Sequence, residues 1–64
     1  MDIYFKDNEH YDVIAQCSHE DMPILPNSND KIWLNGWLYE VVKREFELSD
    51  SVIRHSFVNI YVKQ

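Results

Sequence analysis

The feature that most constrains the fold of this chain is the pair Asn35-Gly36, which separates two apolar runs within residues 31–48. Asn-Gly is the strongest short-range signal for a two-residue β-hairpin, because a type I′ turn requires positive φ at both central positions and these residue types tolerate it. A two-residue loop also determines the strand register, and an ion pair between Lys31 and Glu40 would support it. The expected opposite pairs are Leu34 with Trp37, Trp33 with Leu38, Ile32 with Tyr39 and Lys31 with Glu40.

The two faces of this hairpin differ in character, because side chains alternate between faces along a strand. One face is uncharged and is expected to form the core; its members are Ile32, Leu34, Trp37, Tyr39 and Val41. The other face mixes aromatic, apolar and charged side chains, a combination typical of a binding site. The candidate partner-binding residues on it are Lys31, Trp33, Leu38, Glu40 and Arg44. The alternative is that a second layer of strands or a second copy of the chain covers this face.

The apolar pattern changes phase after Val41, since Val42, Phe46 and Leu48 carry it from there on. A one-residue slip in register would place the whole set on the wrong face. We therefore expect a β-bulge near Val41-Val42, which restores the phase and bends the strand as small barrels require. The alternative is a strand that ends near Val42 and restarts after an irregular turn.

The remaining segments have simpler patterns. Residues 2–6 and 57–63 alternate as strands, and the second of these is rich in β-branched and aromatic residues. Residues 10–17 fit either a strand or a helix, and the strand fits better. Residues 18–30 contain two prolines and a run of turn-forming residues, which predicts a loop lying on the core. Residues 49–56 are expected to be a connection, either one helical turn or an exposed loop tip.

These elements predict one small domain that spans residues 1–64. Four or five short strands with evenly spaced turns favour an all-β fold, because closing a small sheet reduces its exposed edges. We expect a small antiparallel curled sheet or an SH3-like barrel built on the central Asn-Gly hairpin. The alternative is an α+β fold in which a helix over residues 9–17 packs on the sheet.

A chain of 64 residues buries a limited share of its surface and usually needs additional stabilisation. Cys17 is the single cysteine, which excludes an internal disulfide and favours a reducing cytoplasm. Nine aromatic residues, or self-association, would supply the stabilisation instead. The sequence contains no apolar run of about 18 residues and no signal-peptide pattern, so no membrane partner is expected.

The net charge of −5 is unevenly distributed along the chain. Residues 1–30 hold seven acidic residues and one lysine, whereas residues 31–64 hold four acidic and five basic residues. An acidic surface repels phosphate groups, so direct nucleic-acid binding is disfavoured and a protein partner or self-association is expected. The same distribution is compatible with an acidic decoy that occupies a nucleic-acid-binding protein.

The segment from Cys17 to Asp21 is a local cluster of residue types that bind metals or act as nucleophiles. A structural zinc site usually takes four ligands from two paired motifs, and the chain has no second cysteine. A thiol nucleophile with His19 as its base would also need an oxyanion hole and a pocket. None of the common catalytic motifs is present. We expect no catalytic residues, no metal ligands, no cofactor and no enzymatic activity.

A sparse pattern runs through residues 26–62. It reads Pro26-x-x-x-Asp30-x-Ile32-x-Leu34-x-Gly36-x-x-Tyr39-x-Val41-Val42, followed by Val58-x-Ile60-x-Val62. This order of proline, turn, acidic residue, strand, glycine turn and strand resembles short phage- and prophage-encoded β-proteins. The resemblance implies a phage accessory protein in the cytoplasm of a bacterial host, and it transfers no active-site residue because the pattern is structural.

The functional expectation is a small non-enzymatic protein-interaction module that binds a host protein. Two alternatives remain open at this point. One is the acidic decoy, a DNA-mimic-like inhibitor of a nucleic-acid-binding protein. The other is an oligomeric virion or assembly component, which would also explain how so short a chain stays folded.

Overall fold

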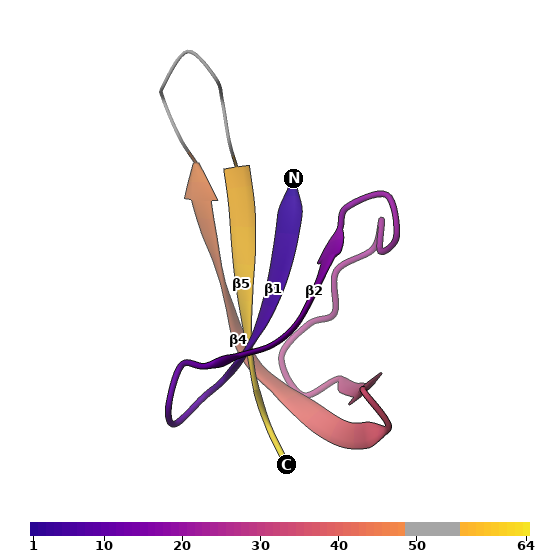
Figure 1. Ribbon diagram of the computed structural model, residues 1–64, viewed down its shortest axis with the longest axis vertical. Coiled ribbons are helices and arrows are strands. Elements are labelled where there is room, and N and C mark those ends of the chain that lie inside the picture. The colour runs from indigo at the N-terminus through magenta and orange to yellow at the C-terminus, as the bar shows by residue number, and fades with distance from the viewer. Residues whose placement is uncertain (49–55) are drawn as a thin grey trace.

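The computed structural model describes residues 1–48 and 56–64, and its described part consists of five β-strands joined by turns and one long loop (Figure 1). The strands are β1 (Asp2–Asp7), β2 (Val13–Ser18), β3 (Lys31–Leu34), β4 (Trp37–Leu48) and β5 (Ser56–Lys63). The connection expected over residues 49–56 lies outside the described residues, except for Ser56, which begins β5.

The strands form one nearly closed, barrel-like sheet in the order β2-β1-β5-β4-β3. The expectation of a small all-β barrel is confirmed, and no helix occurs in the described residues. The helix considered for residues 9–17 is wrong, because β2 occupies most of that segment. The expectation of a wholly antiparallel sheet also needs correction, since β1 and β5 pair in parallel. Parallel strands need a long crossover, and β2, β3 and β4 together provide one here.

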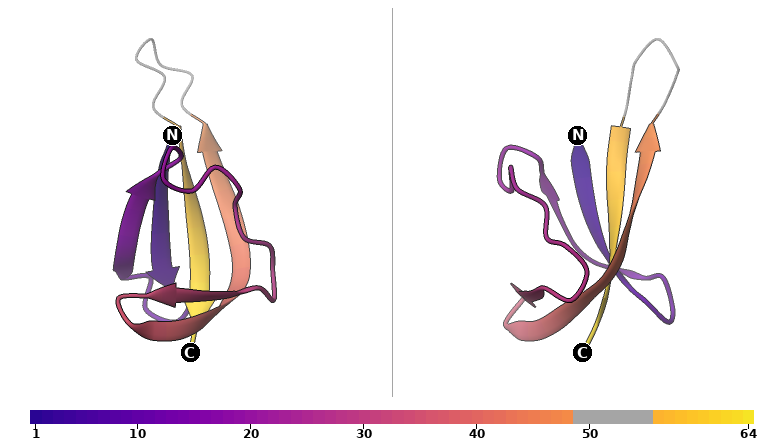
Figure 2. Two further views of the ribbon diagram at one scale, coloured as in Figure 1. Left: turned by 90° about the vertical axis from the view of Figure 1, so that its right-hand side faces the viewer. Right: turned by 180° about the vertical axis from the view of Figure 1, so that it is seen from behind.

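Between β3 and β4 the chain reverses at Asn35 and Gly36, which both have positive φ, at 53° and 86°. The antiparallel pairs across this turn are Lys31 with Glu40, Ile32 with Tyr39, Trp33 with Leu38 and Leu34 with Trp37. The expected bulge is present, because the register between β4 and β5 shifts between Val41 and Lys43. The bend carries the hairpin across the open side of the sheet (Figure 2).

The core lies on the inner face of the sheet, and β5 supplies its centre. Its buried hydrophobic residues are Ile3, Phe5, Leu34, Val41, Val58, Ile60 and Val62. Ile32 and Tyr39 pack against this core as partly buried side chains. Trp37 was expected in the core but is 63% exposed, whereas Leu34, directly opposite it across the turn, is buried; of the pair that flanks the turn, only the leucine reaches the core. Phe46 and Leu48 keep the inner-face phase yet are also exposed, towards the end of β4.

The loop between β2 and β3 lies against the core, as its apolar residues suggested. Met22 and Leu25 pack on the core cluster as partly buried side chains. The end of the loop is tied to β4 by two backbone hydrogen bonds, since Asn29 N–H donates to the Val41 carbonyl and Val41 N–H donates to the Asp30 carbonyl, both at 2.8 Å. These bonds set the position from which β3 begins.

Candidate protein-interaction surface

The outer side of the hairpin presents four of the five candidate residues, namely Lys31, Trp33, Leu38 and Glu40; we call these four the outer hairpin surface. Trp33 and Leu38 are directly opposite each other on β3 and β4, so their side chains share a face. Trp33 is 69% exposed and Leu38 is 43% exposed. Two large apolar side chains are therefore adjacent to each other and open to solvent.

A small charge network borders this apolar pair. Lys31 Nζ donates a hydrogen bond of 2.8 Å to Glu40 Oε1, and Lys63 Nζ lies 3.9 Å from Glu40 Oε2. The hydrogen bond from Lys31 is the largest cause that lowers the pKa of Glu40 below its ordinary value, and the charges of Lys31 and Lys63 act in the same direction. The carboxylate is thus held ionised between two ammonium groups beside the tryptophan.

Arg44, the fifth candidate, lies elsewhere. It pairs with Ile60, whose side chain is fully buried in the core, so Arg44 belongs to the inner-face phase of the sheet. Its guanidinium carbon lies 5.8 Å from the centre of the Phe46 ring. The bulge between Val41 and Lys43 is the reason, since one extra residue moves every later side chain of β4 to the opposite face.

An aromatic cluster that no local sequence pattern predicts extends the outer face from β4 across β5 to β1. Tyr4 packs edge-to-face on Phe57 with ring centres 5.6 Å apart, and Tyr11 packs in the same way on Tyr61 at 5.7 Å. Lys43 Nζ lies 4.9 Å from the centre of the Tyr61 ring. These contacts join residues far apart in sequence, so only the pairing of β1 with β5 brings them together.

Two polar side chains are held within or beside this aromatic cluster. A hydrogen bond to Glu45, followed by burial, raises the pKa of Tyr61 above its ordinary value. Asn59 is 3% exposed, and its Nδ2 lies 3.5 Å from Glu47 Oε1. Its Oδ1 is buried without a hydrogen-bond partner among the described residues. A buried acceptor without a partner costs stability.

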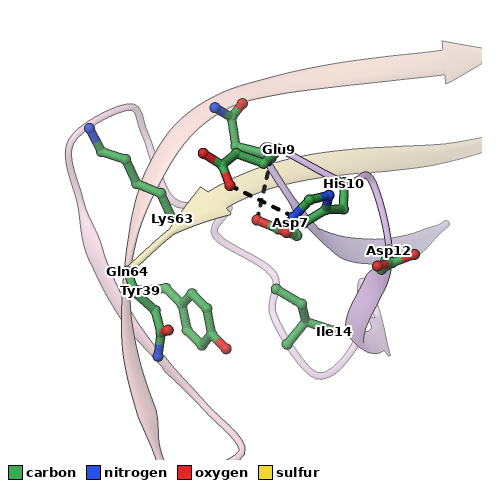
Figure 3. A pocket seen from close by; sticks show the side chains of 9 residues that line it. Asp7, Glu9, His10, Asp12, Ile14, Tyr39, Lys63 and Gln64 are labelled. Carbon is green, nitrogen blue, oxygen red and sulfur yellow. Dashed lines mark hydrogen bonds and ion pairs between the residues drawn. The ribbon is translucent and has the colours of Figure 1, made fainter.

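One groove of about 600 Å³ lies at the end of the sheet where β1 turns into β2 (Figure 3). Asp7, Glu9 and His10 lie on one side of it and Tyr39 and Lys63 on the other. Glu9 N–H donates to Asp7 Oδ1 at 3.3 Å, and His10 Nε2 lies 3.8 Å from Glu9 Oε2. Within the described residues, no three metal-ligating side chains are grouped so that they could hold an ion.

A second hollow, of about 360 Å³, lies between β2 and β3, and we call it the β2–β3 gap. Partly buried Cys17 lines it together with Met22 and Ile32. Burial, and to a smaller extent the charge of Asp21, raises the pKa of the Cys17 thiol above its ordinary value. An activated thiol nucleophile needs the opposite shift, so this environment supports an inert lining residue rather than a catalytic one.

Comparison of the chain with protein-family models, with curated proteins and with solved structures finds no match. In the described part of the chain there is no helix with the length and hydropathy of a membrane span. The fold and the surface therefore place this protein in a structural class: a small barrel-like β-domain with an exposed aromatic hairpin. The resemblance to phage-encoded proteins stays a prediction from the sequence pattern.

Proposed function

We propose that this domain is a non-enzymatic protein-interaction module that binds its partner through the outer hairpin surface. The observation that carries the proposal is the exposed Trp33 directly opposite the exposed Leu38, bordered by the Lys31–Glu40 ion pair. Tryptophan is enriched among the residues that dominate binding energy, and a polar rim that excludes water typically surrounds them. The finer form of the proposal, a phage-encoded accessory protein that binds a host protein in the bacterial cytoplasm, rests on the residue pattern alone.

The energetic argument concerns the surface that Trp33 leaves in water. Aromatic side chains bury a large apolar area when they are covered, and the indole also offers an N–H donor. A leucine beside the indole widens the apolar centre of the patch, while Lys31 and Glu40 satisfy each other at 2.8 Å and need no partner charge. A partner that covers this surface therefore gains apolar contact and leaves no buried charge without a counter-charge.

The acidic decoy receives less support from the positions of the carboxylates. A mimic of a phosphate backbone needs its acidic groups in a row, whereas the acids of residues 1–30 are spread over several elements. Asp2 and Asp7 are the two ends of β1, and Asp30 directly precedes β3. Asp12 precedes β2, and Glu20 and Asp21 follow it. Oligomerisation through the same exposed residues remains a form of the proposed interaction in which the partner is a second copy.

The chain offers a matched pair of tryptophans for the test. Trp33 and Trp37 are similarly exposed, at 69% and 63%, but alternate to opposite faces of the same hairpin. Immobilised wild-type protein, Trp33→Ala and Trp37→Ala would each be incubated with a bacterial lysate, and the retained proteins would be quantified by mass spectrometry. We expect Trp33→Ala to weaken capture of a specific partner at least tenfold, as for a residue that dominates an interface, and Trp37→Ala to leave it unchanged.

Sedimentation of the wild type and the two variants at micromolar concentration separates a foreign partner from self-association. A monomer that captures a partner through Trp33 supports the module as stated. Dimerisation that Trp33→Ala abolishes supports self-association through the same surface. Equal capture by wild type and Trp33→Ala, together with equal sedimentation, contradicts the proposal.

A further inference from the structure

β2 and β3 are the two ends of the sheet order, so the barrel is left open along the β2–β3 gap. The gap has a largely apolar lining, with Phe5, Ala15, Cys17, Met22, Ile32 and Leu34 among its lining residues. At one end Asn35 Nδ2 donates to the Ile14 carbonyl at 3.0 Å. At the other end the Asp21 and Met22 amides donate to the Ser18 carbonyl. The bond from Asn35 joins the two strands at one end of the gap, and at the other end the chain turns away after β2.

The edge of β2 directs main-chain groups into this gap. His19 N–H donates to the Met1 carbonyl at 2.9 Å, and the alternation of an antiparallel ladder then makes Cys17 and Ala15 the residues bonded to β1. Gln16, between them, directs its N–H and C=O away from β1. Within the described part of the chain, no other backbone group pairs with Gln16 across the gap.

The edge of β3 also directs main-chain groups into the gap, from the opposite side. In a two-residue hairpin the residues that flank the turn, Leu34 and Trp37, exchange hydrogen bonds with each other. Trp33 therefore directs its N–H and C=O away from β4, and it also lines the gap. Among the residues that the structure describes, the donors and acceptors of these two strand edges have no backbone partner across the hollow. Such an arrangement binds an added strand.

The charges around β2 indicate which kind of strand fits. β2 itself carries no charge, but Asp12 precedes it and Glu20 and Asp21 follow it. If a second copy paired antiparallel with β2 about Gln16, Asp12 of each copy would lie opposite Glu20 of the other. Like charges opposite each other are destabilising, so β2 disfavours a second copy and favours a segment with basic residues.

We propose that the β2–β3 gap binds an extended, basic segment of a partner protein, which bonds to Gln16 and Trp33 through its main chain and places an apolar side chain in the hollow. This inference deepens the interaction function proposed above and rests on it, because Trp33 borders both the gap and the outer hairpin surface. A basic side chain of the segment lies near Asp21, which lines the gap.

The test uses two synthetic peptides as probes, one of alternating lysine and valine and one with glutamate in place of lysine. Each peptide is titrated into ¹⁵N-labelled protein while amide shifts and hydrogen exchange are followed. We expect the lysine peptide to shift the Gln16 and Trp33 amides and to slow their exchange. The glutamate peptide should bind at least about tenfold more weakly, because like charges then meet across the gap.

Three variants decide where the peptide binds. Gln16→Pro removes the edge N–H and should weaken binding of the lysine peptide at least tenfold, whereas Leu38→Ala, on the outer hairpin surface alone, should leave it unchanged. Asp21→Lys inverts an exposed charge and should reverse the preference between the peptides, which provides a test even if Gln16→Pro does not fold. Asp21→Asn removes the charge but keeps an oxygen that can accept the bonds from Ser18, so it serves as the control for the loss of those bonds. Equal binding of both peptides to the wild type, or an effect of Leu38→Ala without an effect of Asp21→Lys, overturns the gap proposal.

The result of the peptide experiment can be distinguished from the result of the partner-capture experiment that tests the proposed function. Loss of partner capture in Trp33→Ala and Leu38→Ala with no peptide shift at Gln16 retains the interaction surface and refutes the gap. The opposite result is also informative. If the lysine peptide binds at Gln16 and Leu38→Ala leaves partner capture unchanged, the gap proposal is supported and the outer hairpin surface is refuted.

Discussion

β5 and β3 belong to the same sheet but have contrasting environments. β5 pairs with β1 on one side and with β4 on the other, and every residue from Val58 to Val62 is buried. β3 pairs only with β4, and Leu34 is its one buried residue. In a domain with a single sheet, the strand that is covered on both faces supports the fold, while the strand at the edge keeps side chains and main-chain groups free for a partner.

The burial of β5 on its outer face explains how the contrast arises. Its inner side chains, Val58, Ile60 and Val62, fill the inside of the curled sheet. Its outer side chains are covered by rings from the N-terminal part of the chain, since Tyr4 packs on Phe57 and Tyr11 on Tyr61. No comparable cover exists over Trp33 or Leu38 in the described residues. Some of the aromatic residues of this short chain therefore stabilise β5 by covering it, whereas Trp33 on β3 stays exposed to solvent.

The largest expected effect tests whether β5 is the stabilising strand. Ile60→Ala should lower the free energy of unfolding by about 2–5 kcal/mol, because it removes a fully buried side chain and leaves a cavity that the sheet fills only in part. Leu38→Ala should change it by about 0.5 kcal/mol or less, as for an exposed residue. Urea unfolding followed by tryptophan fluorescence measures both. Similar losses in the two variants would show that the two strands do not differ as described.

Local features of this contrast follow from the sequence, and long-range features do not. The turn at Asn35 and Gly36 depends only on the φ values those residues tolerate, and the pairs beside it depend only on loop length. The bulge is visible as a change of apolar phase after Val41. Each of these signals lies within a few residues of the feature it predicts.

The parallel pairing of β1 with β5 has no such local signal. It joins the two ends of the described chain, and a strand pattern carries no information about which strand lies beside it. The aromatic contacts of Tyr4 and Tyr11 depend on that pairing and were missed with it. Arg44 shows a different failure, since it was assigned to the outer face by simple alternation although the bulge before it reverses the phase. The exposure of Trp37 reflects how far the packed core extends, which periodicity does not report.

The second prediction asks how β3 holds its position with little burial. Gly36 has φ of 86° and nothing within 4 Å of where a Cβ would lie, so an alanine there meets no clash and only the backbone conformation opposes it. Gly36→Ala should destabilise the domain by about 1–2 kcal/mol. Asn35→Gly keeps the turn and removes the bond to the Ile14 carbonyl, so it reports that bond separately. If Gly36→Ala is neutral in urea unfolding, the turn does not hold the hairpin.

The smallest expected effect concerns the charges that border Trp33. The pKa of Glu40 is lowered in the folded state, chiefly by the hydrogen bond from Lys31, so its contribution to stability is present above the pKa of the unfolded chain and is lost as pH falls through the folded pKa. The stability difference between wild type and Glu40→Gln should therefore be present near pH 7 and disappear in acid, and salt should reduce it because the pair is accessible to solvent. In a Lys31→Gln background most of this difference should vanish, since Lys63 lies farther away at 3.9 Å. A difference that persists unchanged in acid would mean that Glu40 acts through packing rather than charge, and the outer hairpin surface would then share the structural role that β5 performs.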